Sequence, residues 1–301
     1  MSAAAPPLSH RKAPKWLPYL LISPTLVIVL VFTAWPTVQA IYMSFFRQYL
    51  NFAKFRTPTF IGLQNYKELF TSPDFLQVLK NTAIYVIGTV PASIVLAFLF
   101  ALLVNRAVKG IGLARLGFFY PTILPMVSAA TIWMFFFTPD YGLFNTFLET
   151  FGYHGPENWL GNPHLALLAV MIVAVWKNAG YLMIFYLAGL QNLPEDVFEA
   201  ASLDGASWWT QLWKIAFPLL RRTTLFVSTI AIIDAFQVVD HIFVMTQGGP
   251  SGASTVLLYY LWQVRFEDQN VGLASALTVV LIVIMLAITI TNFVLSEREG
   301  A

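Results

Sequence analysis

Long stretches without a single charged residue are the feature that most limits what this chain can fold into. Four stretches are apolar and uncharged from end to end: 16–46, 81–105, 116–139 and 269–296. A helix of about 20 apolar residues crosses the hydrocarbon core of a bilayer, and it bonds its own backbone polar groups where no water is available. Hydrophobic residues make up 58% of the chain, against roughly 45 to 50% in soluble globular domains. These stretches therefore predict membrane-spanning helices.

Two further stretches are long enough to span a membrane but contain charges. Lys177 lies within 158–194, and Asp234 and Asp240 lie within 223–246. We therefore predict an all-α membrane protein with six transmembrane helices. The membrane domain is expected at 16–296, with spans at about 17–46, 81–105, 116–138, 165–190, 223–246 and 272–295, a long loop at 191–222, and tails at 1–15 and 297–301.

The first apolar stretch follows basic residues, as the apolar part of a signal peptide does. It is longer than that part, and no clear small-residue cleavage site follows it. We therefore expect it to be a retained first span.

An even number of spans places both chain ends on one side of the membrane. The distribution of Lys and Arg favours the cytoplasm for both ends, because the inner segments then hold Arg11, Lys12, Lys15, Arg106, Lys109, Arg115, Lys214, Arg221, Arg222 and Arg298. The outer segments hold fewer basic residues: Arg47, Lys54, Arg56, Lys67, Lys80 and Arg265. Most of these outer residues lie in the loop 47–80, which is an exception to the rule. The loop 191–222 is expected in the cytoplasm.

Composition excludes several classes of function. The chain has no cysteine, so disulfides, a thiolate nucleophile and a Cys-ligated zinc site are all excluded. The chain has 17 Lys and Arg against 15 Asp and Glu, and the basic residues form no long block. Nothing therefore supports nucleic-acid binding. No histidines occur at metal-ligand spacing, and no G-x-x-x-x-G-K-[ST] phosphate loop is present. We expect no metal and no cofactor on this chain.

The loop 191–222 carries the signals of a short first helix. Pro194 fits the first helical position, and Glu195 and Asp196 then place negative charge at a helix N-terminus. Asp204 and Gly205 provide a stop, because glycine tolerates the left-handed conformation of a C-cap. The face between these ends is small and apolar, with Val197, Ala200, Ala201 and Leu203.

A second helix of the same loop is expected to start at Ser207 as its N-cap. The spacing of one helical face then fits Trp209, Leu212, Trp213 and Ala216. An amphipathic helix with tryptophans is suited to the boundary between lipid and water. Physical chemistry alone leaves two interpretations open: a loop that merely joins two spans, or an elbow whose first helix faces a partner protein.

Three motifs give the chain a resemblance to a known family. The pattern Glu199-Ala200-Ala201, Gly205, Ile215, Phe217-Pro218 resembles the EAA signature of permease subunits in bacterial binding-protein-dependent ABC importers, with Phe217 where leucine is usual. Residues 60–66 resemble the GL-NY element of the carbohydrate-uptake branch, and residues 246–250 resemble its T-GGP element. The T-GGP element is typical of the first type of permease, similar to the maltose and glycerol-3-phosphate systems.

The resemblance implies several partners and a bacterial plasma (inner) membrane location. Expected are a second homologous permease, an ATPase homodimer that carries ATP and Mg, and an extracytoplasmic substrate-binding protein, either soluble or lipid-anchored. The transported solute would be a sugar or a related polyol phosphate. In the family the EAA elbow docks into a cleft on the ATPase; by position this contact would involve Glu199, Ala200, Ala201, Asp204 and Gly205.

Polar residues at membrane depth are expensive and are candidates for a substrate pathway. Asn178 and Tyr181 are one helical turn apart, and Asp234 and Gln237 are spaced in the same way. By resemblance to sugar-site positions and by chemistry, we take as pathway candidates Lys177, Asn178, Tyr181, Asp234, Phe236 and Gln237.

Structural roles are the alternatives for these residues. Asp234 can pair with Lys177 or with a basic group of a partner, and Tyr181 and Gln237 can make hydrogen bonds between helices. Asp240 and His241 are expected nearer the outer end, to contact the binding protein or cap a helix.

Two other functions compete with the importer permease. An ion-coupled secondary transporter would use Asp234, Lys177 and Asp240, but it favours inverted repeats that this sequence does not show. An intramembrane enzyme would use Asp234 as an acid or base, but no second group at catalytic spacing supports it. We therefore predict a transporter subunit that is not an enzyme. Prolines in or beside the spans leave open whether the helices kink for function: Pro24, Pro36, Pro91, Pro121 and Pro125.

Overall fold

A computed structural model describes residues 16–105, 108–153 and 157–298. The expected tail 1–15 lies outside these residues, as do residues 299–301 of the expected tail 297–301. The described chain is almost entirely helical, which confirms the predicted fold class, and it includes one small sheet. In this sheet β1 (Phe46–Arg47) pairs antiparallel with β2 (Thr59–Phe60).

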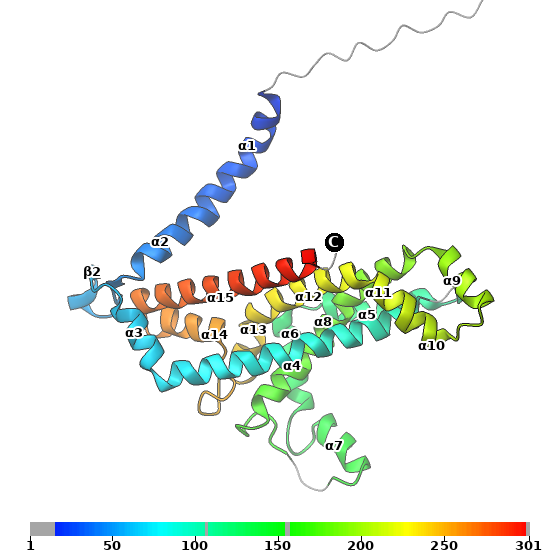
Figure 1. The fold of residues 1–301 in the computed structure, drawn as a ribbon. Helices are drawn as coiled ribbons and strands as arrows, with labels where there is room; N and C mark the ends of the chain where they lie inside the picture. The colour runs from blue at the N-terminus through cyan, green and yellow to red at the C-terminus, as the bar shows by residue number, and fades with distance from the viewer. Residues whose placement is uncertain (1–15, 106–107, 154–156, 299–301) are drawn as a thin grey trace, which may run out of the picture.

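Two long helices form the centre of the bundle, α4 (Pro73–Val104) and α8 (Ala166–Gln191). They pack along each other, and α12 (Arg221–Phe236) packs against both (Figure 1). Small residues allow this close contact: Ala97 and Ala169 are fully buried. Since lipid supplies no hydrophobic drive between helices, such close packing holds membrane helices together.

A second packing unit lies where α3 (Gln64–Thr71), α14 (Leu257–Trp262) and α15 (Val271–Arg298) meet the start of α4. Within the membrane, α15 is also tied to α12, because the Asn292 side chain donates to Thr229 Oγ1 at 2.6 Å. Together these contacts assemble one bundle.

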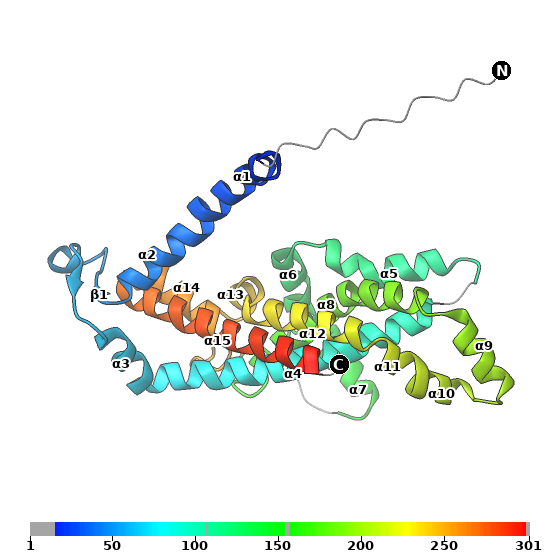
Figure 2. The same ribbon diagram turned by 45° about the horizontal axis from the view of Figure 1, so that its top comes forward.

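The first helical stretch stands away from this bundle. It consists of α1 (Leu17–Val29), a π-helical turn (Leu30–Ala34) and α2 (Trp35–Met43), and we refer to it as the arm. Figures 1 and 2 show it projecting outward from the α15 side, where α2 contacts α15. None of the tested membrane-length stretch in Tyr19–Met43 is buried within the subunit. Lipid or another protein must therefore surround the arm.

By length and composition, the described residues contain 4 helices able to span a membrane, or up to 6 if each of two bent pairs counts as one span. The first bent pair is α5 (Ile111–Ile123) and α6 (Met126–Phe136), which meet at 101°. The expected continuous span 116–138 is therefore broken. The second pair joins Trp208–Leu219 to α12 at 66°.

The structure also divides the expected span 223–246. The helix α12 ends at Phe236, and after a short irregular segment α13 (Asp240–Met245) begins. At the other extreme, α4 begins at Pro73, well before the expected 81. Ser72 caps it by accepting from Phe75 N, with Pro73 and Asp74 in the first turn. The apolar run marks the lipid-embedded part of a helix rather than its ends.

The remaining elements are short and lie in the connections. They are a 3-10 turn (Ala53–Phe55), α7 (Leu143–Thr150), α9 (Glu195–Leu203), α10 (Trp208–Gln211), α11 (Phe217–Leu219) and two further π-helical turns (Leu212–Ala216 and Gln263–Glu267).

Candidate functional site

The loop 191–222, which we call the EAA loop, forms one end of the bundle and contains α9 and α10 (Figure 1). Helix α9 begins at Glu195, one residue after the expected start, because Pro194 itself occupies the N-cap. The helix ends before Asp204. Gly205 follows in the left-handed region at φ +77°, as the sequence predicted.

The second half of the EAA loop starts at its expected cap. The Ser207 side chain accepts from Thr210 N at 3.3 Å. Gln211 ties the two halves together, since its amide donates to Ser202 Oγ at 2.9 Å and to the Ala206 carbonyl at 3.3 Å. These bonds fix the angle between the two short helices.

The expected apolar face of this second half is divided in two. Leu212 and Ala216 are buried, whereas Trp209 and Trp213 are exposed. The two tryptophans are therefore available to lipid headgroups or to a partner, while the aliphatic residues anchor the loop on the bundle.

The residues predicted to contact an ATPase lie at the surface of the EAA loop. Glu199, Ala200, Asp204 and Gly205 are exposed, and Ala201 is half-buried. A Cβ added at Gly205 would meet nothing within 4 Å. Leu203 was not predicted as a contact residue, although its side chain is 90% exposed at the end of α9. Its signal was a bulky apolar residue directly before the helix stop.

A cavity of about 160 Å³ brings together four of the six pathway candidates, Lys177, Asn178, Asp234 and Gln237. The other lining residues are Tyr85, Met126, Ala174, Val238, Val239, Asp240 and His241. The lining comes from α8, from the break between α12 and α13 with the adjoining ends of these helices, and from Tyr85 on α4 and Met126 on α6. The break is a place where irregular backbone lines a cavity inside a membrane protein, which is where such backbone is tolerated.

Two pathway candidates do not line this cavity. The ring of Tyr181 packs edge-on against Phe185, with centroids 5.3 Å apart. Phe236 is 8% exposed, at the end of α12. In this conformation both side chains contribute to packing beside the cavity.

A buried pair that the sequence analysis missed closes one side of the cavity. Tyr85 Oη lies 3.1 Å from His241 Nε2, and both side chains are buried. This bond holds α13 against α4. His241 was expected near the outer end, as a contact for the binding protein or a helix cap; instead it faces the interior. Nothing in the uncharged run around Tyr85 signalled this pairing.

Lys177 makes no ion pair with Asp234 among the described residues. Its ammonium instead donates to backbone carbonyls at the α5–α6 break: Pro121 O at 3.0 Å, Thr122 O at 3.3 Å, and Leu124 O. The alternative in which these two residues pair is therefore not the arrangement in this structure.

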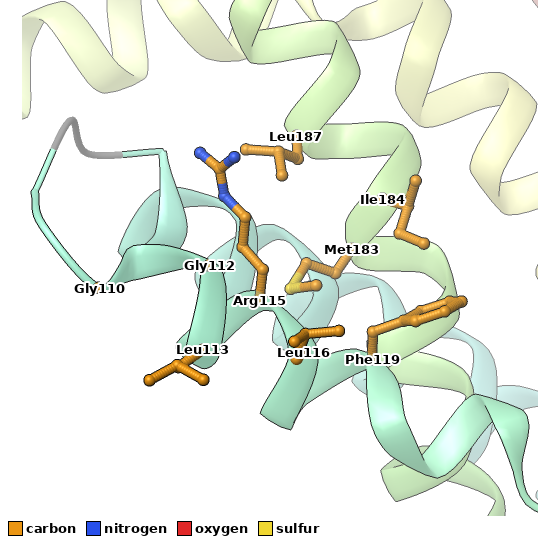
Figure 3. Close-up of a pocket in the computed structure, with 9 residues that line it drawn as sticks. All are labelled: Gly110, Gly112, Leu113, Arg115, Leu116, Phe119, Met183, Ile184 and Leu187. Carbon is orange, nitrogen blue, oxygen red and sulfur yellow. The ribbon is translucent and has the colours of Figure 1, made fainter.

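A larger cavity of about 700 Å³ lies between α5 and α8, away from every predicted site residue. Figure 3 shows it lined by Gly110, Gly112, Leu113, Arg115, Leu116, Phe119, Met183, Ile184 and Leu187. The Arg115 guanidinium donates to the Val104 carbonyl at 3.0 Å. Because its walls are almost wholly apolar, this cavity offers few partners for a polar solute. The smaller polar cavity is the better candidate.

Metal ligation has no support in the described part of the chain. Among those residues, no group of three or more His, Asp or Glu side chains is placed to hold an ion.

Comparison with known families identifies the chain's type. Residues 71–299 match the profile of the family described as "Binding-protein-dependent transport system inner membrane component". This match includes the EAA and T-GGP motifs and confirms the resemblance to the family, whereas the GL-NY element at 60–66 precedes the matched residues. It favours the importer permease over the ion-coupled transporter and the intramembrane enzyme.

Curated relatives match along nearly the whole chain. The sn-glycerol-3-phosphate transport system permease protein of Agrobacterium fabrum is 34% identical over 95% of this chain and 96% of its own length. The trehalose/maltose transport system permease protein of Thermococcus litoralis is 34% identical over 94% of each. The arabinooligosaccharides transport system permease protein of Halalkalibacterium halodurans is 33% identical over 94% of this chain and 88% of its own.

Solved structures share the fold. A chain of a bacterial ABC transporter involved in the import of the acidic polysaccharide alginate superposes with a TM-score of 0.80, at 23% identity, over 94% of this chain and 96% of that one. The alginate transporter in complex with a pentasaccharide-bound periplasmic protein gives a TM-score of 0.81 at 22% identity, over 94% and 95%. By profile and by relatives at this identity, the protein belongs to the family of binding-protein-dependent ABC transporter inner membrane permeases, multi-pass subunits that are not themselves ATPases.

Proposed function

We propose that this subunit moves a sugar or a related polyol phosphate across the bacterial inner membrane, driven by a separate ATPase that grips the EAA loop. One observation carries the proposal. The polar cavity is lined in part by α8 and by Asp234 near the end of α12, and these are the helices that enter and leave the EAA loop. A displacement of the loop therefore reaches the cavity through the continuous α8, and through α12 beyond the 66° bend that precedes it.

The distance involved is short enough for rigid transmission. From Asn178 to the end of α8 at Gln191 the helix is continuous, which corresponds to about 20 Å at 1.5 Å per residue. A continuous helix carries a displacement of its end along its whole length, whereas an irregular linker would absorb it. The helix α8 thus connects the cavity to the EAA loop without an irregular segment between them.

The volume of the polar cavity is smaller than that of a usual solute-binding pocket. Its volume of about 160 Å³ falls below the roughly 300–1,000 Å³ usual for ligand pockets. A second, homologous permease would supply the missing wall, and the uncovered arm offers that subunit a surface. Amide and carboxylate groups of Asn178, Gln237 and Asp234 around the cavity suit a hydroxyl-rich solute. The relatives include permeases named for maltose, arabinooligosaccharides and glycerol-3-phosphate.

The other expected partners follow from the same function. An ATPase homodimer would bind ATP and Mg, and its cleft would receive Glu199, Ala200, Ala201, Asp204 and Gly205. An extracytoplasmic binding protein, soluble or lipid-anchored, would deliver the solute at the opposite end of the bundle. In this arrangement both chain ends lie in the cytoplasm.

The orientation is tested by thiol labelling, for which the absence of cysteine gives a clean background. We expect a membrane-impermeant maleimide to label Phe147→Cys, on α7, in intact spheroplasts. It should label Leu203→Cys, on α9, only after the membrane is opened. Labelling of Leu203→Cys from outside would exclude contact between the EAA loop and an ATPase.

Coupling is tested in the reconstituted complex with its binding protein. Gly205→Leu should abolish solute uptake and solute-stimulated ATP hydrolysis while the subunit remains in the membrane. The matched control is Gly152→Leu, since Gly152 also has a positive φ (+85°) and no atom within 4 Å of an added Cβ, but lies in another loop. Wild-type uptake by the double variant Glu199→Gln with Gly205→Leu would contradict the proposal.

A further inference from the structure

The break between α5 and α6 leaves backbone carbonyls without their helical partners. In a continuous helix, the carbonyl of Pro121 would accept from the N–H of residue 125. Residue 125 is a proline and has no N–H. Leu124 is extended, with ψ 134°, so the chain leaves the helix there. In a bilayer such carbonyls must be satisfied from within the protein.

Lys177 supplies the missing donors from a different helix. Its ammonium carries three N–H groups and no acceptor. Three carbonyls lie within reach, those of Pro121, Thr122 and Leu124. The donors and acceptors therefore match in number, so carbonyls at the break accept from all three N–H groups of the lysine.

Small residues on α8 allow the lysine to reach this far. Gly180 is one turn from Lys177 and so lies on the same helix face. A Cβ added at Gly180 would overlap the carbonyl oxygen of Phe118 in α5, and Ala179 beside it is fully buried. The backbone of α5 thus lies directly on α8, and this contact sets the distance that Lys177 spans.

We propose that Lys177 is a positioning residue that keeps the third span bent at 124–125. The bend directs α6 toward α13, against which it packs, and places Met126 in the wall of the polar cavity. Lys177 thereby shapes the cavity through α6, while Asn178, Asp234 and Gln237 present their polar groups to it. The effect on the bend stands on geometry alone, and the effect on uptake rests on the proposed function.

The bend is measured directly with a spin-label pair in the cysteine-free background. Leu113→Cys and Ile132→Cys place labels on exposed positions of α5 and α6. A straight helix would separate these residues by about 28 Å, and the observed bend of 101° shortens this to about 18 Å, at 1.5 Å per residue. In the assembled complex, Lys177→Met should lengthen or broaden the distance distribution, and Lys177→Arg should keep the short distance.

An unchanged distance in Lys177→Met would overturn the proposal. If that variant does not accumulate in the membrane, Lys177→Gln serves in its place, since it keeps two neutral donors on a shorter chain; it should give a mixture of short and long distances. An unchanged single distance in Lys177→Gln would equally overturn the proposal. These measurements need no solute, so their outcome is independent of whether the protein transports a sugar.

Uptake separates the positioning role from an ion pair with Asp234. Lys177→Met should lose uptake, Lys177→Arg should regain it, and Lys177→Met with Asp234→Asn should remain without uptake. Restoration by the double variant would show that the charge of Asp234, rather than the carbonyls, is what Lys177 balances. If wild-type uptake is absent but the bend still depends on Lys177, the proposed function fails and this inference holds.

Discussion

Two glycines with nearly the same backbone conformation occupy opposite surroundings in this molecule. Gly205 in the EAA loop has φ +77°, and a Cβ added there would meet nothing within 4 Å. Gly248 has φ +78°, and a Cβ there would overlap Thr255 Oγ1 and lie 2.9 Å from Tyr259 Cε1. Each belongs to a motif typical of the family. The motifs therefore exist for different reasons: one shapes a surface, the other closes an interior contact.

The region around Gly248, residues 246–255, which we call the GGP loop, is held by its own chain. Ser254 is fully buried and donates to Gly249 O at 2.7 Å. The Asn81 side chain on α4 donates to Gly252 O at 2.8 Å and Thr255 O at 3.0 Å. The GGP loop is thus part of the packed fold.

The GL-NY motif behaves like the GGP loop. Asn65 is buried and donates to Ser44 O at 2.7 Å and Phe46 O at 3.0 Å. Tyr66 donates to Ser44 Oγ at 2.7 Å. These bonds fasten the end of the arm to α3. By contrast, Gln211 of the EAA loop bonds within that loop, to Ser202 Oγ and to the Ala206 carbonyl.

Gly248→Ala should produce the largest loss of stability. A small loss would contradict the contrast between the buried GGP loop and the exposed EAA loop. Left-handed strain costs roughly 1–2 kcal/mol and overpacking about 1–3 kcal/mol. We therefore expect the free energy of unfolding to fall by about 2–5 kcal/mol, measured by denaturation of the purified complex. Gly252→Ala is the control, because φ is +73° there and the nearest atom, Gln77 Nε2, is 3.6 Å away. Equal losses for both would contradict the packing argument.

Asn81→Leu should cause the second-largest loss in the free energy of unfolding, because it leaves the carbonyls of Gly252 and Thr255 without their donor. Buried groups left unpaired cost about 1–3 kcal/mol, and the same denaturation experiment measures the loss. Gln77→Leu is the matched control, because exposed Gln77 donates to Ser251 O of the same loop at 3.3 Å and water replaces that bond. A cost for Gln77→Leu as large as that for Asn81→Leu would contradict the importance of burial.

Gly205→Ala should cost only the strain of its backbone, roughly 1–2 kcal/mol. Its effect on uptake should nevertheless exceed its effect on subunit levels in the membrane, because the angle of the EAA loop changes. Asparagine tolerates the left-handed region better than alanine, so Gly205→Asn should retain more uptake than Gly205→Ala. The reverse order would show that bulk at this surface, and not the bend, decides coupling.

Leu203→Ser should leave stability within about 0.5 kcal/mol, as for surface substitutions without special contacts. The ATPase should nevertheless co-purify less well with this variant, because an apolar contact at the tip of α9 is removed. Leu143→Ser on α7 is the control, since Leu143 is also exposed. Full retention of the ATPase by Leu203→Ser would remove this residue from the contact surface.

The apolar runs predicted the helices well because lipid imposes a strict rule on what may cross it. Breaks in those helices follow no such local rule. Pro91 lies inside the continuous α4, whereas Pro125 sits at the break between α5 and α6. Whether a span breaks depends on donors from another helix, here Lys177 on α8, and sequence alone does not place that donor.

The residues proposed to contact the ATPase could be named from the sequence because their motif is local, and the structure places most of them at the surface. The cavity was partly accessible to prediction. Asp234 and Gln237, spaced by three residues, both line it, but of Asn178 and Tyr181 on α8 only Asn178 does. The hydrogen bond between Tyr85 and His241 could not be predicted from the sequence, because the two residues are far apart in the chain. Tyrosine in an apolar run has the same local pattern whether it packs or bonds.

The arm contributes almost nothing to the interior of its own subunit. The bundle can therefore pack completely before the arm has bound lipid or a partner subunit. Assembly of the transporter then has a natural order, with bundles completed first and arms placed last. A subunit made without its partners would therefore leave the apolar surface of the arm uncovered by protein, held to the bundle where α2 contacts α15 and where Asn65 and Tyr66 bond to Ser44 and Phe46.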